Sequence, residues 1–436
     1  MKIKYWQEDL EKIDRKSLAD IQLKLLKQTI TQALKTPFYS QRLKKAGISS
    51  PEDITALEDL HKIPFTTKDD LRDAYPFGLL AVELKDVVRI HTSSGTTGKP
   101  TVIYHTRDDI DNWANLVARC IVMTGCGPED VFQNMMSYGL FTGGLGLHYG
   151  AERVGMMVIP AGGGNTRRQL QLMTDFGTTV IHVTPSYLLH ITDKLQEFGF
   201  KREELKLKKG FLGAEPYSES TRKKIEALLD IDVYNSYGLS EMNGPGVAFE
   251  CVYKGGMHVW EDAYIMEVID PYTEEVLPDG EEGELVFTTL QREATPLLRY
   301  RTRDLAVIYP QGCRCGRTHR KISRIKGRTD DMLIINGVNI FPSQIEEVLM
   351  ANPDIGSNYQ IYVEKDGYLD KLTVKVEIKP DVFHGDIKEL EILKERIRGD
   401  LKASIVINPV VELLEPGSLP PWEGKAKRVV DNRERL

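Results

Sequence analysis

Residues 92–100 (TSSGTTGKP) form a loop whose side chains could bind phosphate. Five hydroxyl side chains, two glycines and one lysine lie within nine residues. Glycines let backbone N–H groups turn inward, hydroxyls add donors and the lysine adds charge, so the loop suits a phosphate group. A Walker A loop is excluded, because that pattern needs other residues where Ser93 and Pro100 stand. A flexible surface linker is the alternative, but lysine and threonine crowded between predicted strands at 87–91 and 101–104 argue against it.

Four further segments carry side chains suited to nucleotide chemistry. Residues 237–241 (YGLSE) follow a predicted strand and offer an aromatic ring and a carboxylate at its carboxyl end, where open α/β sheets bind ligands. Residues 300–304 (YRTRD) supply an acid suited to a sugar diol, and residues 327–331 (GRTDD) lie at a predicted domain boundary. Residues 421–428 (PWEGKAKR) place a lysine in a glycine-flanked loop. Each segment alone is more often a structural turn, a surface ion pair or a solvated tail.

The cysteines suggest a metal site. Cys251 and His258 are seven residues apart, while Cys313 and Cys315 form a Cys-x-Cys flanked by glycines. Three thiolates and one imidazole match a closed tetrahedral zinc site, provided that the fold brings the two pairs together. Two alternatives stay open: the cysteines pack as small apolar side chains, or His319 is the fourth ligand.

The composition is that of an ordinary soluble globular protein. Of 436 residues, 28% are charged and 41% are hydrophobic, and this length favours two or three domains. The net charge of −7 favours no nucleic-acid partner. The N-terminal residues lack the apolar stretch of a signal peptide and no apolar run reaches about 18 residues, so we expect no signal peptide and no membrane partner. Five cysteines without a secretion signal predict the reducing cytoplasm, with Cys120 and Cys126 structural.

The order of the predicted elements indicates an α/β fold. A helix at 17–34 opens the chain, and a helix at 107–123 follows the glycine loop. Alternating strands and helices come next, which is typical of parallel βα units. The strands are expected at 131–135, 156–160, 179–183, 210–213 and 232–235, and helices begin near Gly144, Thr166, Ser186 and Ser218.

The pattern of predicted elements changes beyond about residue 250. Antiparallel strands are expected there, at 264–269, 283–290 and 304–309. A hairpin at 332–340, with Asn336 and Gly337 as its turn, then opens a small α+β region. We therefore predict a large N-terminal domain, residues 1–329, with a β-rich part at about 250–329, and a small mobile C-terminal α+β domain, residues 330–436.

Together, in this order and spacing, the motifs resemble those of the adenylate-forming superfamily of acyl-CoA synthetases over nearly the whole chain. The likeness is closest to the phenylacetate–CoA ligase branch, in residues 138–144 (YGLFTGG), 148–152 (HYGAE), 213–216 (GAEP) and 423–429 (EGKAKRV). The resemblance implies that a carboxylic acid is joined to the α-phosphate of ATP as an acyl-adenylate, releasing pyrophosphate. The thiol of coenzyme A would then displace AMP.

The resemblance also implies a role for each motif. Residues 92–99 hold the β- and γ-phosphates, Tyr237 stacks on adenine and Asp304 binds the ribose hydroxyls. Glu241 and Lys425 are the catalytic residues: Glu241 helps to place Mg²⁺, and Lys425 neutralises charge at the carboxylate and the α-phosphate. The full nucleotide-binding set that it implies is Thr92, Ser93, Ser94, Gly95, Thr96, Thr97, Gly98, Lys99, Gly213, Ala214, Glu215, Pro216, Asn235, Ser236, Tyr237, Gly238, Asp304 and Arg328.

Asp330 falls at the hinge position of the family. The C-terminal domain is expected to swing about it, presenting Lys425 for adenylation and the Asn336–Gly337 turn to coenzyme A for thioester formation. The acid pocket is expected to suit a flat aromatic ring, or else its two aromatic residues pack in the core. Its predicted residues are Tyr138, Phe141, Gly143, Gly213 and Ala214.

The identity of the acid and of the acceptor stays open at this stage. Phenylacetate is the first candidate, with indoleacetate or another aryl acid as alternatives. A carrier protein could replace coenzyme A as the acceptor, although the ligase branch is the better match. A nucleotide-binding regulator without catalysis is the alternative from a different class, and Lys425, Glu241 and Asp304 argue against it. A homodimer is left open.

Overall fold

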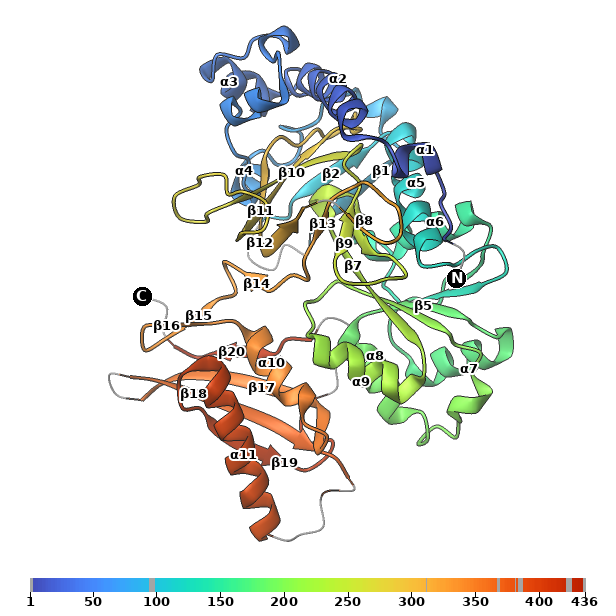
Figure 1. The fold of residues 1–436 in the computed structure, drawn as a ribbon, viewed down its shortest axis with the longest axis vertical. Coiled ribbons are helices and arrows are strands. Elements are labelled where there is room, and N and C mark those ends of the chain that lie inside the picture. Colours follow the sequence, from blue (N-terminus) through green and yellow to red (C-terminus); the bar gives the residue numbers. More distant parts are fainter. Residues whose placement is uncertain are drawn as a thin grey trace. The chain divides into compact units, whose positions relative to one another are not determined.

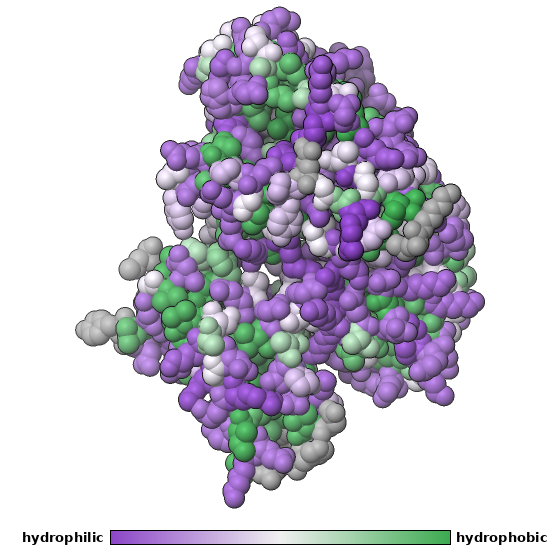
Figure 2. Space-filling model, viewed as in Figure 1, coloured by the Kyte–Doolittle hydropathy of each residue, from purple (hydrophilic) through white to green (hydrophobic). Residues whose placement is uncertain are grey.

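The computed structural model describes residues 3–93, 99–310, 312–366, 369–380, 382, 387–420 and 426–433 (Figure 1). Contacts between Cα atoms divide the chain into two compact units. Unit 1 comprises Met1–Gly162, Val180–His182 and Tyr234–Ile325, and unit 2 comprises Gly163–Thr179, Val183–Val233 and Lys326–Leu436. Among the residues described, no helix is both long and apolar enough to span a membrane. On the face in Figure 2, hydrophilic residues cover most of the surface and hydrophobic residues form separate small groups.

Unit 1 begins with helices α1 (Glu8–Glu11), α2 (Arg15–Ala33), α3 (Pro37–Lys45) and α4 (Lys68–Asp73). Helix α2 confirms the predicted helix at 17–34: Asp14 caps its first turn by accepting a hydrogen bond from Ser17 N, and Leu18, Leu26 and Ile30 are buried on one face. Neither α1 nor α3 was predicted from the sequence.

The glycine loop joins two antiparallel strands, β1 (Arg89–Thr92) and β2 (Val102–His105). Helix α5 (Arg107–Met123) follows as predicted, because Thr106 and Asp109 form a capping box at its start. Helix α6 (Thr142–Val154) packs closely on α5. A Cβ at Gly150 would lie 2.2 Å from Val117, so glycine is required for this close approach.

Strand β3 (Val131–Asn134) pairs in parallel with β4 (Met157–Ile159) and with β5 (Val180–Val183), which confirms the predicted parallel βα units. The β-rich part is antiparallel, also as predicted. The neighbouring strands there are, in spatial order, β10 (Tyr264–Ile269), β11 (Glu282–Thr289), β12 (Tyr300–Tyr309), β13 (Lys321–Ile322), β9 (Met257–Val259), β8 (Gly244–Glu250) and β7 (Asp232–Leu239).

Unit 2 contains helices α7 (Thr166–Phe176), α8 (Pro185–Lys194) and α9 (Glu219–Leu229) and strand β6 (Lys209–Leu212). Its later part begins with β14 (Gly327–Arg328) and the predicted hairpin, β15 (Leu333–Ile335) and β16 (Val338–Ile340). Asn336 and Gly337 both have positive φ, 51° and 83°, as a two-residue hairpin turn requires. Helix α10 (Pro342–Ala351) then packs against α9.

A four-stranded sheet completes unit 2. Its spatial order is β19 (Val410–Leu414), β18 (Leu369–Ile378), β17 (Ile355–Asp366) and β20 (Val429–Asp431). Helix α11 (Ile387–Ile405) buries Leu393, Ile397 and Leu401 at helical spacing. Helix α11 and this sheet agree with the small α+β region predicted from the sequence. Strand β20 pairs in parallel with β17 directly after the lysine-rich loop.

Candidate active site

The ends of the glycine loop are held together by two hydrogen bonds. Ser93 N donates to Thr101 O at 3.1 Å, and Thr101 N donates to Ser93 Oγ at 3.0 Å. Because β1 and β2 pair antiparallel, the two ends of the loop belong to a strand hairpin and not to the start of a helix, which agrees with the exclusion of a Walker A loop. Thr92 is half-buried and Lys99 is exposed, whereas Ser94, Gly95, Thr96, Thr97 and Gly98 lie outside the described residues.

Glu241 lies at the base of this loop. Its Oε1 accepts a hydrogen bond from Thr101 Oγ1 at 3.2 Å, and Lys68 Nζ lies 3.9 Å from the same oxygen. The residue is 5% exposed. A carboxylate held beside a phosphate loop offers the hard oxygen ligand that Mg²⁺ prefers.

Three residues of this region were not predicted, namely Thr101, Lys68 and Arg292. The buried Arg292 fixes the turn that carries Glu241. Its Nη1 donates to Glu241 O at 2.8 Å and its Nε donates to Asn243 Oδ1 at 2.8 Å. Burial lowers the pKa of Arg292 from its ordinary value. Thr101 lies one residue beyond the loop motif and could have been found there, but no local pattern marks Arg292.

The structure brings Tyr237 and Asp304 together although they are far apart in the sequence. Tyr237 OH donates to Asp304 Oδ2 at 2.7 Å, and both residues are buried. Gly238 is required beside them, since a Cβ there would lie 1.5 Å from Gly244 O. The ring predicted to stack on adenine and the acid predicted to bind ribose are therefore neighbours.

Strand β7 also carries the two preceding predicted nucleotide residues, Asn235 and Ser236. Both are buried, and Asn235 N donates to Glu250 Oε2 at 2.8 Å on β8. This hydrogen bond and the pairing of β7 with β8 fix the strand end that presents Tyr237.

Tyr138 belongs to a polar network in unit 1. Its hydroxyl accepts from Asn134 Nδ2 and lies next to His148 Nδ1, each at 3.1 Å, and His148 Nε2 lies 3.0 Å from a Glu152 oxygen. Burial raises the pKa of Tyr138 to about 12, so the hydroxyl is protonated at neutral pH. These contacts fix the orientation of the ring.

Phe141 is 46% exposed and precedes α6 as its N-cap, so it is not a core residue. A Cβ at Gly143 would lie 3.3 Å from Met136 Cε, a flexible side-chain end, so only modest movement would accommodate it. The other two predicted pocket residues, Gly213 and Ala214, belong to unit 2. A shared acid pocket therefore stays a prediction.

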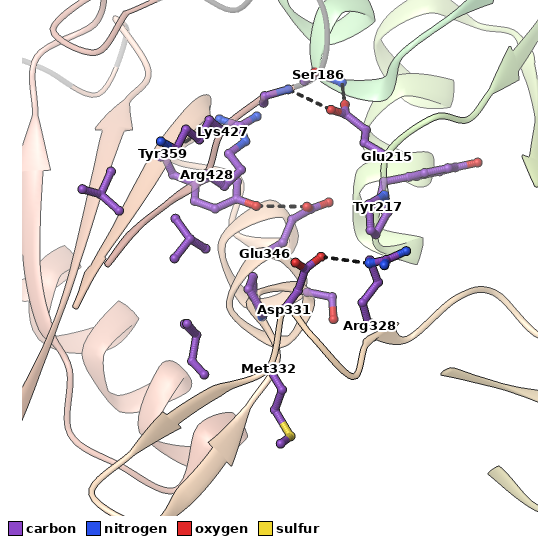
Figure 3. A pocket seen from close by; sticks show the side chains of 18 of the residues that line it. Ser186, Glu215, Tyr217, Arg328, Asp331, Met332, Glu346, Tyr359, Lys427 and Arg428 are labelled. Atoms are coloured by element: carbon purple, nitrogen blue, oxygen red, sulfur yellow. Dashed lines mark hydrogen bonds and ion pairs between the residues drawn. The ribbon is translucent and has the colours of Figure 1, made fainter. Parts of the chain in front are cut away.

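Unit 2 contains a cavity of about 640 Å³ with Glu215 on its wall (Figure 3). Both oxygens of this half-buried carboxylate accept hydrogen bonds from backbone groups: Oε1 accepts from Ser186 N at 2.7 Å and Oε2 from Ala426 N at 3.0 Å. Burial raises the pKa of Glu215. Ala214, directly before it, has a φ of 69°, which is uncommon for a residue other than glycine.

Lys425 lies outside the described residues, but the segment that follows it lines the same cavity. Ala426 is held by Glu215, and Arg428 lies over the Tyr359 ring, 4.3 Å from its centroid. Tyr359 OH donates to a Glu346 oxygen at 3.0 Å (Figure 3). This segment then enters the sheet as β20.

Arg328, Asp330 and Pro216 also line this cavity. Arg328 forms a bidentate ion pair with Asp330, with Nε to Oδ1 at 2.8 Å and Nη2 to Oδ2 at 2.9 Å. The Asn336 side chain donates to Asp370 O at 2.8 Å, which fixes the hairpin tip. The predicted nucleotide, hinge and coenzyme A roles of these residues remain predictions.

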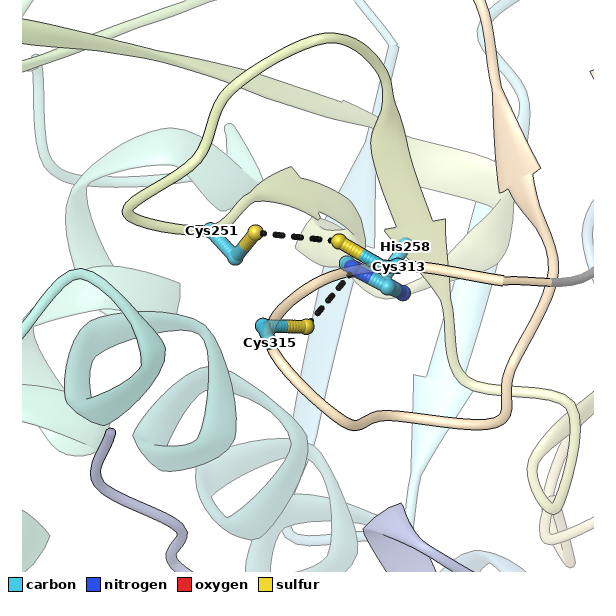
Figure 4. Close-up of side chains that lie close together, drawn as sticks. All are labelled: Cys251, His258, Cys313 and Cys315. Atoms are coloured by element: carbon cyan, nitrogen blue, oxygen red, sulfur yellow. Dashed lines mark hydrogen bonds between the residues drawn. The ribbon is translucent and has the colours of Figure 1, made fainter.

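The predicted metal ligands lie together in unit 1 (Figure 4). The four donor atoms of Cys251, His258, Cys313 and Cys315 are all within 4.8 Å of one another. His319 is not a ligand, because its Nδ1 accepts from a backbone N–H at 3.0 Å and its Nε2 lies 2.9 Å from a backbone oxygen.

Comparison with known proteins agrees with the motifs. The family model described as AMP-binding enzyme matches residues 14–291, and the model of the AMP-binding enzyme C-terminal domain matches residues 337–433. The phenylacetate-coenzyme A ligase of Aromatoleum evansii is 48% identical over 432 residues, covering 98% of this chain and 97% of that protein. The phenylacetate-coenzyme A ligase of Escherichia coli is 46% identical over 419 residues, covering 95% of each.

Among solved structures, 2-hydroxyisobutyryl-CoA ligase in the postadenylation state, in complex with R3-HIB-AMP, is similar with a TM-score of 0.93. The sequence identity is 28%, and the match covers 99% of this chain and 93% of that one. The similarity therefore includes the large N-terminal part and the smaller C-terminal part alike.

Proposed function

The chain belongs to the family of AMP-binding enzymes, and we propose that it is an acid–thiol ligase that joins phenylacetate to coenzyme A with ATP. The observation that carries the proposal is identity of 46–48% to phenylacetate-coenzyme A ligases over nearly the full length of both chains. The described residues support it, because carboxylate, hydroxyl and aromatic groups suited to ATP lie around the ends of the glycine loop and on β7.

In the first step a carboxylate oxygen of the acid attacks the α-phosphorus of ATP, and the bond to the β-phosphate breaks to release pyrophosphate. Residues 92–99 would bind the β- and γ-phosphates, and Glu241 would hold Mg²⁺, which screens the charge of the phosphates. Tyr237 and Asp304 would hold the adenosine. Lys425 would stabilise the charge that develops between the carboxylate and the α-phosphate.

In the second step the sulfur of coenzyme A attacks the acyl carbon, the bond to AMP breaks, and the thiol proton leaves to solvent. We propose that the C-terminal domain rotates about Asp330 between the steps, which carries Lys425 away and brings the Asn336–Gly337 turn to coenzyme A. The contacts inside unit 2 that such a rotation would break include those of Glu215 with Ala426, of Lys224 with Ile355 and of α10 with α9.

The acid pocket supports an aryl substrate. Tyr138 offers a ring fixed by its hydroxyl contacts, and Phe141 offers a second ring that is not committed to the core. Phe141→Ala should raise KM for phenylacetate much more than KM for ATP. An equal loss for both substrates, with a lower melting temperature, would favour a packing role.

A pyrophosphate-release assay tests the proposal with a panel of phenylacetate, indoleacetate and 2-hydroxyisobutyrate, with and without coenzyme A. We expect release with all substrates present to be fastest for phenylacetate, with phenylacetyl-CoA as the product. Acyl-adenylate that accumulates and is not consumed by coenzyme A would favour a carrier-protein acceptor. No pyrophosphate exchange with any acid would favour a nucleotide-binding regulator.

We place this reaction in the cytoplasm, where reducing conditions suit five cysteines of which none forms a disulfide. The cysteine–histidine cluster shares no residue with the proposed nucleotide, acid or coenzyme A contacts, so we propose a structural Zn²⁺ there. The homodimer stays a prediction, which sedimentation of the purified protein would test.

A further inference from the structure

Residues 3–13, here called the N-terminal arm, lie along the turn that carries two of the cysteines. Tyr5 OH donates to Cys315 O at 2.6 Å. Gly316 has a φ of 80°, and a Cβ there would lie 2.7 Å from the Tyr5 hydroxyl. A residue other than glycine would therefore be strained here by its φ and would displace the Tyr5 hydroxyl.

A buried ion pair joins the arm to the same turn. Arg317 Nε donates to Glu11 Oε2 at 2.7 Å, and Arg317 Nη2 donates to Lys4 O at 2.8 Å. Both side chains of the pair are fully buried. The other oxygen of Glu11 accepts from Trp6 N and Gln7 N at 2.7 and 2.8 Å, so this carboxylate also orders the arm itself.

The next two residues of the turn continue the contact. Thr318 N donates to Glu11 O at 3.1 Å and Thr318 Oγ1 donates to Ile13 O at 2.7 Å. His319 Nε2 lies 2.9 Å from Leu10 O. Each residue from Cys315 to His319 thus contacts the arm, and most of these contacts are hydrogen bonds whose geometry depends on where the turn is held.

The four donor atoms fit a zinc ion. Tetrahedral Zn²⁺ with bonds of about 2.3 Å to sulfur separates two sulfurs by about 3.8 Å. The Cys251 and Cys313 sulfurs are 3.7 Å apart, and the Cys315 sulfur is 3.4 Å from His258 Nε2 (Figure 4). His258 Nδ1 lies 3.1 Å from His319 O, so the N–H belongs on Nδ1 and Nε2 is left as the electron-pair donor.

The ligands come from two segments that are far apart in the sequence. Cys251 follows β8 and His258 lies on β9, whereas Cys313 and Cys315 lie in the turn between β12 and β13. Gly312 and Gly316 both have positive φ, so this turn follows a path that other residues rarely adopt. An ion at the cluster would therefore tie the turn to β8 and β9 at two points.

We infer that zinc bound by Cys251, His258, Cys313 and Cys315 fastens the N-terminal arm to the β-rich part of unit 1. The inference rests on the structural zinc proposed above. With the metal bound, the turn holds Arg317, Thr318 and His319 in the positions from which they bond to the N-terminal arm. Without it, two cross-links of the turn are lost, and the buried pair of Arg317 and Glu11 loses the support that keeps it aligned.

Elemental analysis and hydrogen exchange on the full-length protein test this inference. We expect about one zinc ion per chain. Removing it with a thiol reagent and a chelator should speed amide exchange in residues 3–13 by more than about tenfold, and adding zinc back after reduction should reverse the change. Exchange in α11 of unit 2 serves as the internal control and should not change.

Three variants separate the metal from the arm. Cys313→Ser should lose zinc and loosen the arm, although it alters no residue that bonds to the arm. Arg317→Met should keep zinc and still loosen the arm. Arg314→Lys, at an exposed position of the same turn whose side chain lies over Tyr253, is the matched control and should change neither. If Cys313→Ser does not fold, zinc removal from the native chain gives the same comparison.

The outcomes distinguish the two parts of the inference. Less than about half an equivalent of zinc in metal-replete protein, iron in its place, or a mass about 2 Da low from a disulfide would overturn the zinc site. One equivalent of zinc whose removal leaves the arm unchanged would overturn the fastening and leave the zinc site standing. Neither result bears on the ligase reaction, which the pyrophosphate assay tests independently.

Discussion

The two units differ in the groups that bond to their charged side chains. In unit 1, Arg119 and Asp262 form a buried bidentate pair at 2.7 and 2.9 Å. Burial alone would raise the pKa of Asp262, but the charge and the hydrogen bonds of Arg119, together with the nearby His319, outweigh burial and the pKa is lowered. In unit 2, Glu215 and Lys224 bond to backbone groups instead, at Ser186 N and Ala426 N for the acid and at Ile355 O and Gly356 O for the lysine.

Their pKa values shift accordingly. Burial raises the pKa of Glu215 and lowers that of Lys224 to about 8, so in both the charged form is the disfavoured one. Ion pairs such as that of Arg119 with Asp262 hold unit 1 in one arrangement, because breaking the pair leaves a buried charge without its partner. We expect the hydrogen bonds between charged side chains and backbone groups in unit 2 to be broken and remade more easily than such ion pairs. The contacts of Glu215 with Ala426 and of Lys224 with Ile355 and Gly356 join residues 183–233 to residues 326–436, which are the segments that the proposed rotation would separate.

The largest expected effect is the loss of stability when the ion pair of Arg119 with Asp262 is broken. Arg119→Met should lower the free energy of unfolding by about 3–5 kcal/mol, because Asp262 would be left buried without its partner. Arg107→Met, at an exposed position of the same helix, is the control. Differential scanning calorimetry gives the measurement. A loss below about 1 kcal/mol would mean that the pairs of unit 1 do not lock it.

Lys425→Ala tests whether the contacts of unit 2 are remade during the reaction. Charge develops at the α-phosphate only during adenylation, so the change should slow that step by about 10²–10³. Supplied with synthetic acyl-adenylate and coenzyme A, the variant should form thioester at a nearly normal rate. Rapid-quench assays of each half-reaction provide the measurement. Equal slowing of both steps would contradict the rotation.

Much of this fold is local in origin, and that part was predictable. The helix at 107–123 has its cap and its apolar face in one segment, and the Asn336–Gly337 turn carries its own geometry. Strand β8 was missed because Gly244-Pro-Gly reads as a turn, and β20 because its pairing partner β17 lies far back in the chain.

The candidate site also has a part that local sequence motifs predict and a part that only the fold brings together. Glu241 and Tyr237 stand in a short motif, whereas Arg292 gained its role only through the fold, by bonding to the turn that carries Glu241. The cysteine pairs predicted a metal site, but the sequence left His258 and His319 as rivals. Only the hydrogen bonds of the two rings distinguished them.

Glu215→Gln should have a smaller effect than Lys425→Ala. The amide replaces one of two acceptor oxygens by a donor, so either Ser186 N or Ala426 N loses its partner, at a cost of about 1–3 kcal/mol. Because Ala426 follows Lys425, adenylation should slow while KM for ATP changes little. Glu203→Gln, an exposed glutamate of the same unit, is the control. Unchanged adenylation would show that Glu215 does not position this segment.

The smallest effect is a pH dependence of stability at Lys224. Its folded pKa is about 8 and its ordinary value is 10.5, so between these values the unfolded chain holds a proton that the folded chain has released. Stability should therefore rise with pH in this window, and below about pH 8 the charged lysine opposes folding of unit 2.

Lys224→Met should flatten the rise, whereas exposed Lys223→Met on the same helix should not. The measurement is the melting temperature of each protein between about pH 8 and pH 10. Parallel curves for the wild type and Lys224→Met would mean that this lysine keeps its charge in the folded chain, and the contrast between the units would then rest on Glu215 alone.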